Sequence, residues 1–142
     1  MFMSVNFYDS VDDKLLKFAV IIAKSNGKWV FCKHKKRTTY EIPGGHREPG
    51  EDIVETARRE LVEETGAIDF DLKPICVYSV IDENNFDGSE TFGLLCYAEI
   101  SAFGEIDSEI EKIVMLDDLP DNLTYPNIQP YLIKEMLNRK HI

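Results

Sequence analysis

The segment that most restricts the fold of this chain is residues 44–67, GGHREPGEDIVETARRELVEETGA. Its apolar residues fall within an arc of roughly 100° at the helical period, and they are Ile53, Val54, Ala57 and Leu61. Glu51 and Asp52 suit the positive N-terminal end of a helix, and Gly66 suits a left-handed cap at the other end. The pattern predicts an amphipathic helix over residues 51–65 that packs one face on a larger core.

The rest of the chain is predicted to be mainly strands. Apolar and β-branched runs bounded by turn residues are typical of strands, so we expect strands at residues 14–23, 28–33, 40–43, 72–82, 90–100 and 110–116, and a closing helix at residues 129–139. The turn sequences SNG, PGG and ENNFDG separate several of these runs. They predict an α/β fold, a mixed sheet with helices in α/β/α layers, and one domain over residues 1–142.

The composition restricts the partners of this domain. The chain has 142 residues and 44% hydrophobic content, which suits one sizeable core. Its 26 acidic residues outnumber 16 basic ones and give a formal charge of -10. This charge argues against broad binding to nucleic acid or to an anionic membrane. A phosphorylated partner therefore requires a local basic patch or bound cations.

The cysteines and the N-terminus indicate a protein of a reducing compartment. Cys32, Cys76 and Cys96 are odd in number, lie in apolar stretches and form no CxxC pair, so we expect buried free thiols. The N-terminal stretch has no basic and apolar leader pattern, and the longest apolar run is FAVIIA, too short for a membrane span. We expect a cytoplasmic protein without membrane contact.

An acidic cluster lies on the predicted helix. Glu60, Glu63 and Glu64 are three and four residues apart, so their carboxylates share one face at the margin of the apolar arc. Like charges at this spacing repel by a few tenths of a kcal/mol per pair, and Arg59 supplies one compensating charge. Three hard oxygen ligands without His or Cys indicate bound Mg²⁺, or alternatively Mn²⁺.

The sequence IPGGHREPGE precedes this helix and places a glycine turn beside it. Glycines allow close approach of the backbone to a ligand. No GK[ST] follows, so the turn is not a P-loop. A cation held by carboxylates beside such a turn can clamp phosphate oxygens and activate water.

The spacing of these residues resembles the signature of the Nudix hydrolase family. Gly45, Glu51, the run Arg59-Glu60-Leu61, the pair Glu63-Glu64 and Gly66 match the family's box without a gap. The resemblance implies an α/β/α sandwich and a magnesium-dependent hydrolase of nucleoside diphosphates linked to another group. It also implies roles by position: Glu60, Glu63 and Glu64 as metal ligands with one of them also the base, Arg59 orienting a glutamate, Glu51 bracing loop and helix, and Gly44, Gly45 and His46 contacting substrate.

Four further features have two interpretations each. Lys33 and Arg37 bound a basic cluster that contacts phosphate or is a solvated loop. Glu109 is an extra catalytic carboxylate or plain surface charge, and Asn127 contacts a purine, as an asparagine does in some family members, or caps a turn or helix. The sequence ENNFDG resembles the start of a calcium loop but is better explained as a hairpin turn.

The function expected from these observations is cleavage of a nucleoside triphosphate, including damaged ones, to a monophosphate and pyrophosphate. The alternatives are hydrolysis of ADP-ribose, a dinucleotide polyphosphate or the 5′ pyrophosphate of RNA, or a nucleotide-sensing module without turnover. The sequence leaves open the base, the leaving group, the general base, the phosphorus attacked and the oligomeric state.

Overall fold

The computed structural model describes residues 3–82, 89–106 and 109–139. Its strands are β1 (Met3–Tyr8), β2 (Leu16–Ser25), β3 (Lys28–His34), β4 (Gly44–His46), β5 (Ala67–Asp82), β6 (Glu90–Phe103) and β7 (Ile110–Leu116). Its helices are α1 (Ile53–Thr65), α2 (Gln129–Asn138) and the short 3-10 helix η1 (Asp13–Leu15). None of these helices is long and apolar enough to cross a membrane.

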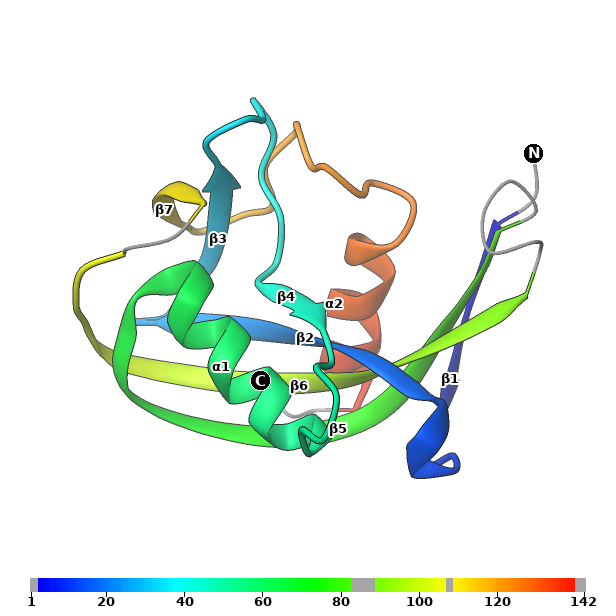
Figure 1. The fold of residues 1–142 in the computed structure, drawn as a ribbon. Helices are drawn as coiled ribbons and strands as arrows, with labels where there is room; N and C mark the ends of the chain where they lie inside the picture. Colours follow the sequence, from blue (N-terminus) through cyan, green and yellow to red (C-terminus); the bar gives the residue numbers. More distant parts are fainter. Residues whose placement is uncertain (1–2, 83–88, 107–108, 140–142) are drawn as a thin grey trace.

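The strands form one mixed sheet of seven strands in the order β1-β5-β6-β2-β3-β7, with β4 paired to β2 beside this path (Figure 1). β2 and β6 run parallel, whereas β1 with β5, β5 with β6, β2 with β3, and β3 with β7 are antiparallel. The predicted mixed sheet is therefore confirmed.

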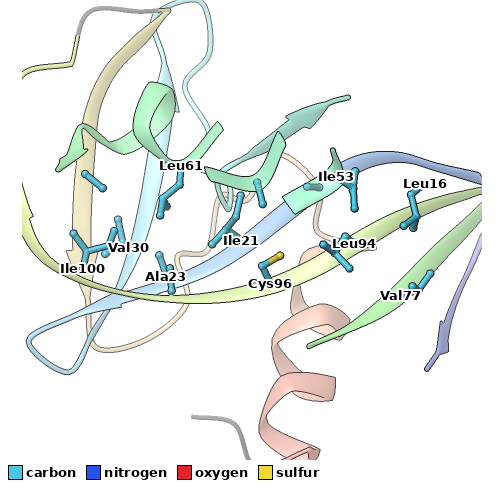
Figure 2. Close-up of a cluster of buried hydrophobic side chains, with 14 residues drawn as sticks. Leu16, Ile21, Ala23, Val30, Ile53, Leu61, Val77, Leu94, Cys96 and Ile100 are labelled. Carbon is cyan, nitrogen blue, oxygen red and sulfur yellow. The ribbon is translucent and has the colours of Figure 1, made fainter. Parts of the chain in front are cut away.

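The two helices cover opposite faces of this sheet. Successive residues of a strand point to opposite sides, so neighbouring strand residues pack against different helices. On one face, Ile21 and Leu94 belong to the core that contains Leu61 of α1 (Figure 2). On the other face, the neighbouring residues Ile22 and Leu95 belong to a second core that contains Leu132, Ile133 and Met136 of α2. The predicted α/β/α layering is confirmed.

The left-handed cap predicted at Gly66 is confirmed, whereas Asp52, which was expected inside the helix, lies just before it. The Asp52 carboxylate accepts a hydrogen bond from the Val54 N–H at 3.0 Å, so Asp52 is the N-cap and the helix begins two residues later than expected. Gly66 adopts a left-handed conformation with φ 76°, and its N–H donates to the Val62 carbonyl. Local sequence therefore determines both ends of this helix.

The strand predicted at residues 40–43 is wrong. Tyr40 and Glu41 form only isolated bridges, to Leu123 and to Cys32 respectively. The strand lies on the glycine turn itself, where Gly44–His46 pairs with β2. A Cβ atom on Gly44 would lie 2.6 Å from the Ala19 carbonyl oxygen, so only glycine permits this approach.

Several other boundaries differ from the prediction. β1 was not expected and pairs with β5 along the edge of the sheet. β5 starts at Ala67 instead of residue 72, because its pairing with β6 extends back to Phe103. The loop predicted at residues 83–88 lies outside the described residues.

Candidate functional site

The glycine turn lies directly against the acidic face of α1. The Gly44 N–H donates to Glu64 Oε1 at 2.8 Å. Gly45 is so close to the next turn of the helix that a Cβ atom there would lie 2.3 Å from Glu60 Cδ. The turn therefore positions two of the three carboxylates that the sequence analysis selected, one through a hydrogen bond and one through direct contact.

Arg59 connects the carboxylates of this site. Its guanidinium donates to Glu51 at 2.7 and 3.0 Å, to Glu60 at 2.7 Å and to Glu63 at 3.4 Å. It also donates to the His46 carbonyl oxygen at 3.0 Å, which ties the helix to the end of β4. These contacts keep the pKa of Arg59 above its usual value, chiefly through the hydrogen bonds to Glu51. Arg59 therefore stays charged and orients Glu60.

Glu51 braces the start of α1 in the manner that the sequence spacing implied. Its carboxylate accepts from Arg59, from the Thr56 hydroxyl at 2.6 Å and from the Glu48 N–H at 3.2 Å. The hydrogen bonds from Arg59, followed by that from Thr56, lower the pKa of Glu51 to about 2. Glu51 is therefore an ionised structural brace.

Glu64 is the most deeply buried acidic group on this helix face. The residue is 9% exposed, and burial, reinforced by the charges of Glu60, Glu41 and Glu63, raises its pKa to about 8 against the opposing effect of the Gly44 N–H. Burial also raises the pKa of Glu60, whereas Glu63 is exposed. Carboxylates with a deficit of positive charge suit a hard divalent cation.

A second buried carboxylate, that of Glu41, is linked to Glu64 through His34. Glu41 is 5% exposed, and both of its carboxylate oxygens accept from Arg37 Nη1, at 2.8 and 2.9 Å. His34 Nε2 contacts Glu41 and lies 3.2 Å from Glu64 Oε2. Sequence reasoning missed Glu41; the available signal was a charged residue inside the apolar stretch YEIP.

A cavity of about 410 Å³ opens beside Glu64, between β2, the glycine turn and α2. Its walls combine aromatic and aliphatic side chains with a few polar ones: Phe18, Val20, Tyr78, Val80, Tyr125, Ile128, Leu132, His34, Arg37, Glu41, Gln129 and Glu64. Apolar walls with few polar groups are typical of small-molecule sites. A wider depression of about 630 Å³ lies near Arg47 and Glu48, but Glu60, Glu63 and Glu64 are not among its lining residues.

Gln129 is a polar lining residue that the sequence analysis did not select. It is 5% exposed, and its Oε1 accepts from the Ile42 N–H at 3.0 Å. This bond identifies the other amide atom as Nε2, which donates to none of the described residues. Gln129 is thus a residue of the cavity wall whose two amide N–H groups have no acceptor among the described residues.

The other predicted site residues are divided between the cavity and the surface. His46 lines the cavity, and its ring packs edge-on against Phe18 with centroids 6.3 Å apart. Arg37 also lines the cavity, whereas Lys33 does not and pairs with Glu111 at 2.9 Å. Asn127 and Glu109 are exposed and lie outside the cavity lining.

Comparison with known proteins shows which family and which solved structures this chain resembles. The family model described as NUDIX domain matches residues 13–134. "Putative 8-oxo-dGTP diphosphatase YtkD" of Bacillus subtilis (strain 168) is 29% identical over 135 residues, covering 94% of this chain and 82% of YtkD. The solved Bacillus subtilis pyrophosphohydrolase BsRppH superposes with a TM-score of 0.79 at 25% identity, covering 99% of this chain and 92% of that one.

A more distant structure shares the fold alone. The Ap4A hydrolase of C. elegans superposes with a TM-score of 0.65 at 16% identity, covering 89% of this chain and all of that one (100%). The fold of this chain is thus shared with hydrolases that carry different names.

Proposed function

Since the chain belongs to the Nudix hydrolase family and is a pyrophosphohydrolase, we propose that it cleaves a nucleoside triphosphate, including damaged ones, to a nucleoside monophosphate and pyrophosphate. The observation that supports this proposal best is the position of Glu64, which lies in the wall of the apolar cavity and beside Gly44. A base in the cavity would extend its phosphates toward the acidic face of α1.

We further propose that Glu60, Glu63 and Glu64 hold Mg²⁺, with Mn²⁺ as a substitute. Their all-oxygen donors and the raised pKa values of Glu60 and Glu64 fit a hard cation. When bound, such an ion neutralises phosphate charge and lowers the pKa of water. Arg59 orients Glu60, the Gly44 N–H fixes Glu64 Oε1, and Glu64 Oε2 lies 3.2 Å from His34 Nε2.

The walls of the cavity suggest which base it accepts. Phe18 and Tyr78 supply aromatic surface for stacking, with ring centroids 5.5 Å apart. The N–H donors of Gln129 match the O6 acceptor that guanine and 8-oxoguanine share, whereas adenine presents a donor at position 6. We therefore assign the base contact to Gln129 in addition to Asn127, and we propose guanine nucleotides as preferred substrates. The similarity to YtkD favours oxidised guanine as one of them.

The remaining assignments are also proposals. Cys32, Cys76 and Cys96 are free and buried, which suits the reducing cytoplasm. His46 and Arg37 line the cavity and are proposed phosphate contacts. Lys33 would reach phosphate only after leaving Glu111, and Glu109 stays a proposed catalytic carboxylate, exposed and outside the cavity lining.

A substrate panel tests the reaction. We expect GTP, dGTP and 8-oxo-dGTP to give monophosphate and pyrophosphate with the highest kcat/KM in a set that includes ATP, ADP-ribose, diadenosine tetraphosphate and 5′-triphosphorylated RNA. A preference of more than roughly tenfold, about 1.4 kcal/mol, for ADP-ribose, the dinucleotide or RNA over every triphosphate would overturn the proposal in favour of that substrate. Binding without turnover of any substrate would indicate a sensing module.

The proposed requirement for a divalent cation is tested with different ions. We expect Mg²⁺ or Mn²⁺ to support turnover, whereas Ca²⁺ binds but supports turnover poorly, because its longer and looser coordination misplaces the attacking water. The measurement is the steady-state rate after chelation and restoration with each ion. Full activity in excess chelator would refute the requirement.

The contact to the base is tested with Gln129→Glu. This variant retains an oxygen for the Ile42 N–H and removes the N–H donors, so we expect kcat/KM for GTP to fall roughly 10- to 100-fold, corresponding to about 1–3 kcal/mol. The loss for ATP should be smaller. Equal losses for both nucleotides would remove Gln129 from base recognition while leaving the hydrolase assignment unaffected.

A further inference from the structure

A second group of metal-binding side chains lies behind the carboxylates of α1. One donor atom each of Cys32, His34 and Glu41 lies within 4.8 Å of the others; this is the only group of three such side chains at this spacing in the described part of the chain, and Glu60, Glu63 and Glu64 do not form one. Cys32 and His34 are two residues apart on β3, so their side chains share a face. Backbone hydrogen bonds of 2.9 and 3.0 Å between Cys32 and Glu41 place Glu41 beside them.

The donor set differs in kind from that of Glu60, Glu63 and Glu64. A thiolate, an imidazole and a carboxylate together select zinc-like ions over magnesium. Tetrahedral zinc requires donors about 3.4 Å apart, given metal–ligand distances near 2.1 Å, so small side-chain movements suffice. Glu64 Oε2 lies 3.2 Å from His34 Nε2 and is a fourth candidate donor.

Charge and access both favour a cation at this position. Glu41 and Glu64 are buried acidic residues on either side of His34 Nε2, which contacts Glu41 and lies 3.2 Å from Glu64 Oε2. His34, Glu41 and Glu64 line the cavity, so an ion can reach them from solvent. Arg37 neutralises Glu41, but its side chain is 42% exposed and can turn outward.

We propose that Cys32, His34 and Glu41 form a binding site for a zinc-like divalent cation, and that its occupation inhibits hydrolysis by drawing Glu64 away from the acidic face of α1. On binding, the Cys32 thiol releases its proton to solvent and gives up its hydrogen bond to the Glu41 carbonyl. On the same event, Arg37 gives up its hydrogen bonds to Glu41 and donates to water instead. Binding is independent of the proposed reaction, whereas inhibition rests on it.

The binding test uses Co²⁺ as a spectroscopic substitute for Zn²⁺. The full chain is titrated with Co²⁺ in excess Mg²⁺, so that Mg²⁺ occupies Glu60, Glu63 and Glu64. We expect one equivalent of Co²⁺ to produce a thiolate-to-cobalt charge-transfer band, which Zn²⁺ then abolishes. Cys32→Ser should lose the band while its hydroxyl still donates to the Glu41 carbonyl.

The matched control is Cys96→Ser, which removes an equally buried thiol from a different part of the sheet. The proposal requires that this variant keep the band. No band in the wild-type protein, or a band that survives in Cys32→Ser, would overturn the site. Circular dichroism of each variant without metal establishes that it is folded.

The inhibition test measures turnover in saturating Mg²⁺ as Zn²⁺ is added. We expect Cys32→Ser to require at least roughly tenfold more Zn²⁺ for half inhibition, since a thiolate is a far better zinc ligand than a hydroxyl. Equal sensitivity of Cys32→Ser and wild type would place the inhibitory ion on Glu60, Glu63 and Glu64 and overturn the proposed regulation. An inactive wild-type protein with an intact cobalt band would instead contradict the proposed function.

Discussion

Glu64→Gln is expected to lower kcat by at least roughly 100-fold while the protein remains folded. The change preserves the size of the side chain and its acceptor for the Gly44 N–H, but it removes the charge that a divalent cation requires at the reacting phosphate. Glu63→Gln should also abolish most activity, although Glu63 is exposed. The measurement is steady-state kinetics of each purified variant in Mg²⁺.

Glu55→Gln is the matched control for these substitutions. Glu55 is exposed and lies on the first turn of the same helix. Its variant should retain near-wild-type turnover. Wild-type kcat in Glu63→Gln or Glu64→Gln would refute the assignment of metal ligands, whereas a comparable loss in Glu55→Gln would show that any charge change on this helix is harmful.

The same substitution should change how stability depends on pH in the absence of metal. The folded protein holds the pKa of Glu64 at about 8, above the ordinary value of 4.5. Between these values the folded state binds more protons than the unfolded state, so this group's contribution to stability is present at low pH and is lost as pH rises toward 8. Glu64→Gln lacks this loss.

We therefore expect the melting temperature of Glu64→Gln to exceed that of wild type increasingly from pH 5 to pH 8, each kcal/mol corresponding to roughly 2–4 °C. Adding Mg²⁺ should raise the melting temperature of wild type more than that of the variant, since a ligand stabilises the state that binds it. Parallel pH profiles for the two proteins would contradict the buried, proton-binding state of Glu64.

Gly45→Ala is expected to reduce kcat roughly 100-fold with little effect on stability. The added Cβ would lie 2.3 Å from Glu60 Cδ, and the flexible end of Glu60 can move away more easily than the backbone. Displacing a catalytic group by about 1 Å can cost on the order of 100-fold in rate. Thermal melting and kcat measured on the same sample test both parts of this result.

Gly44→Ala provides the contrast. Its Cβ would meet the Ala19 carbonyl oxygen at 2.6 Å, and a backbone atom in a paired strand cannot move alone. This variant should lose stability, seen as a lower melting temperature, because the pairing of β4 with β2 is disrupted. If Gly45→Ala instead lost stability and kept its kcat, Glu60 would not be held in its active position by the turn.

Local patterns were sufficient to predict α1 and the three glutamates on it. A helix brings together residues three and four positions apart, so Glu60, Glu63 and Glu64 could be placed on one face from spacing alone. The caps at Asp52 and Gly66 also act within a few residues. The strand predicted at residues 40–43 was wrong because hydrophobic periodicity cannot reveal that the pairing with β2 runs through Gly44–His46.

The cavity was beyond sequence reasoning because its walls come from distant segments. Gln129 meets Ile42, 87 positions away, and α2 supplies Leu132 to the same wall. In the sequence, Glu41 is one of many acidic residues. In the structure, its bridge to Cys32 places it in a buried position beside His34. No short-range rule relates these positions, since their contacts depend on the order of strands in the sheet.

The acidic helix, its cap at Gly66 and the glycine turn before it were predictable because they depend on interactions between near neighbours in the chain. Packing between distant segments, in contrast, sets which of the glutamates is buried, which residues line the cavity, and which basic side chains are paired. Burial and desolvation depend on what packs around a group, and for Glu64 that surrounding includes Gly44 and His34, twenty and thirty residues before it.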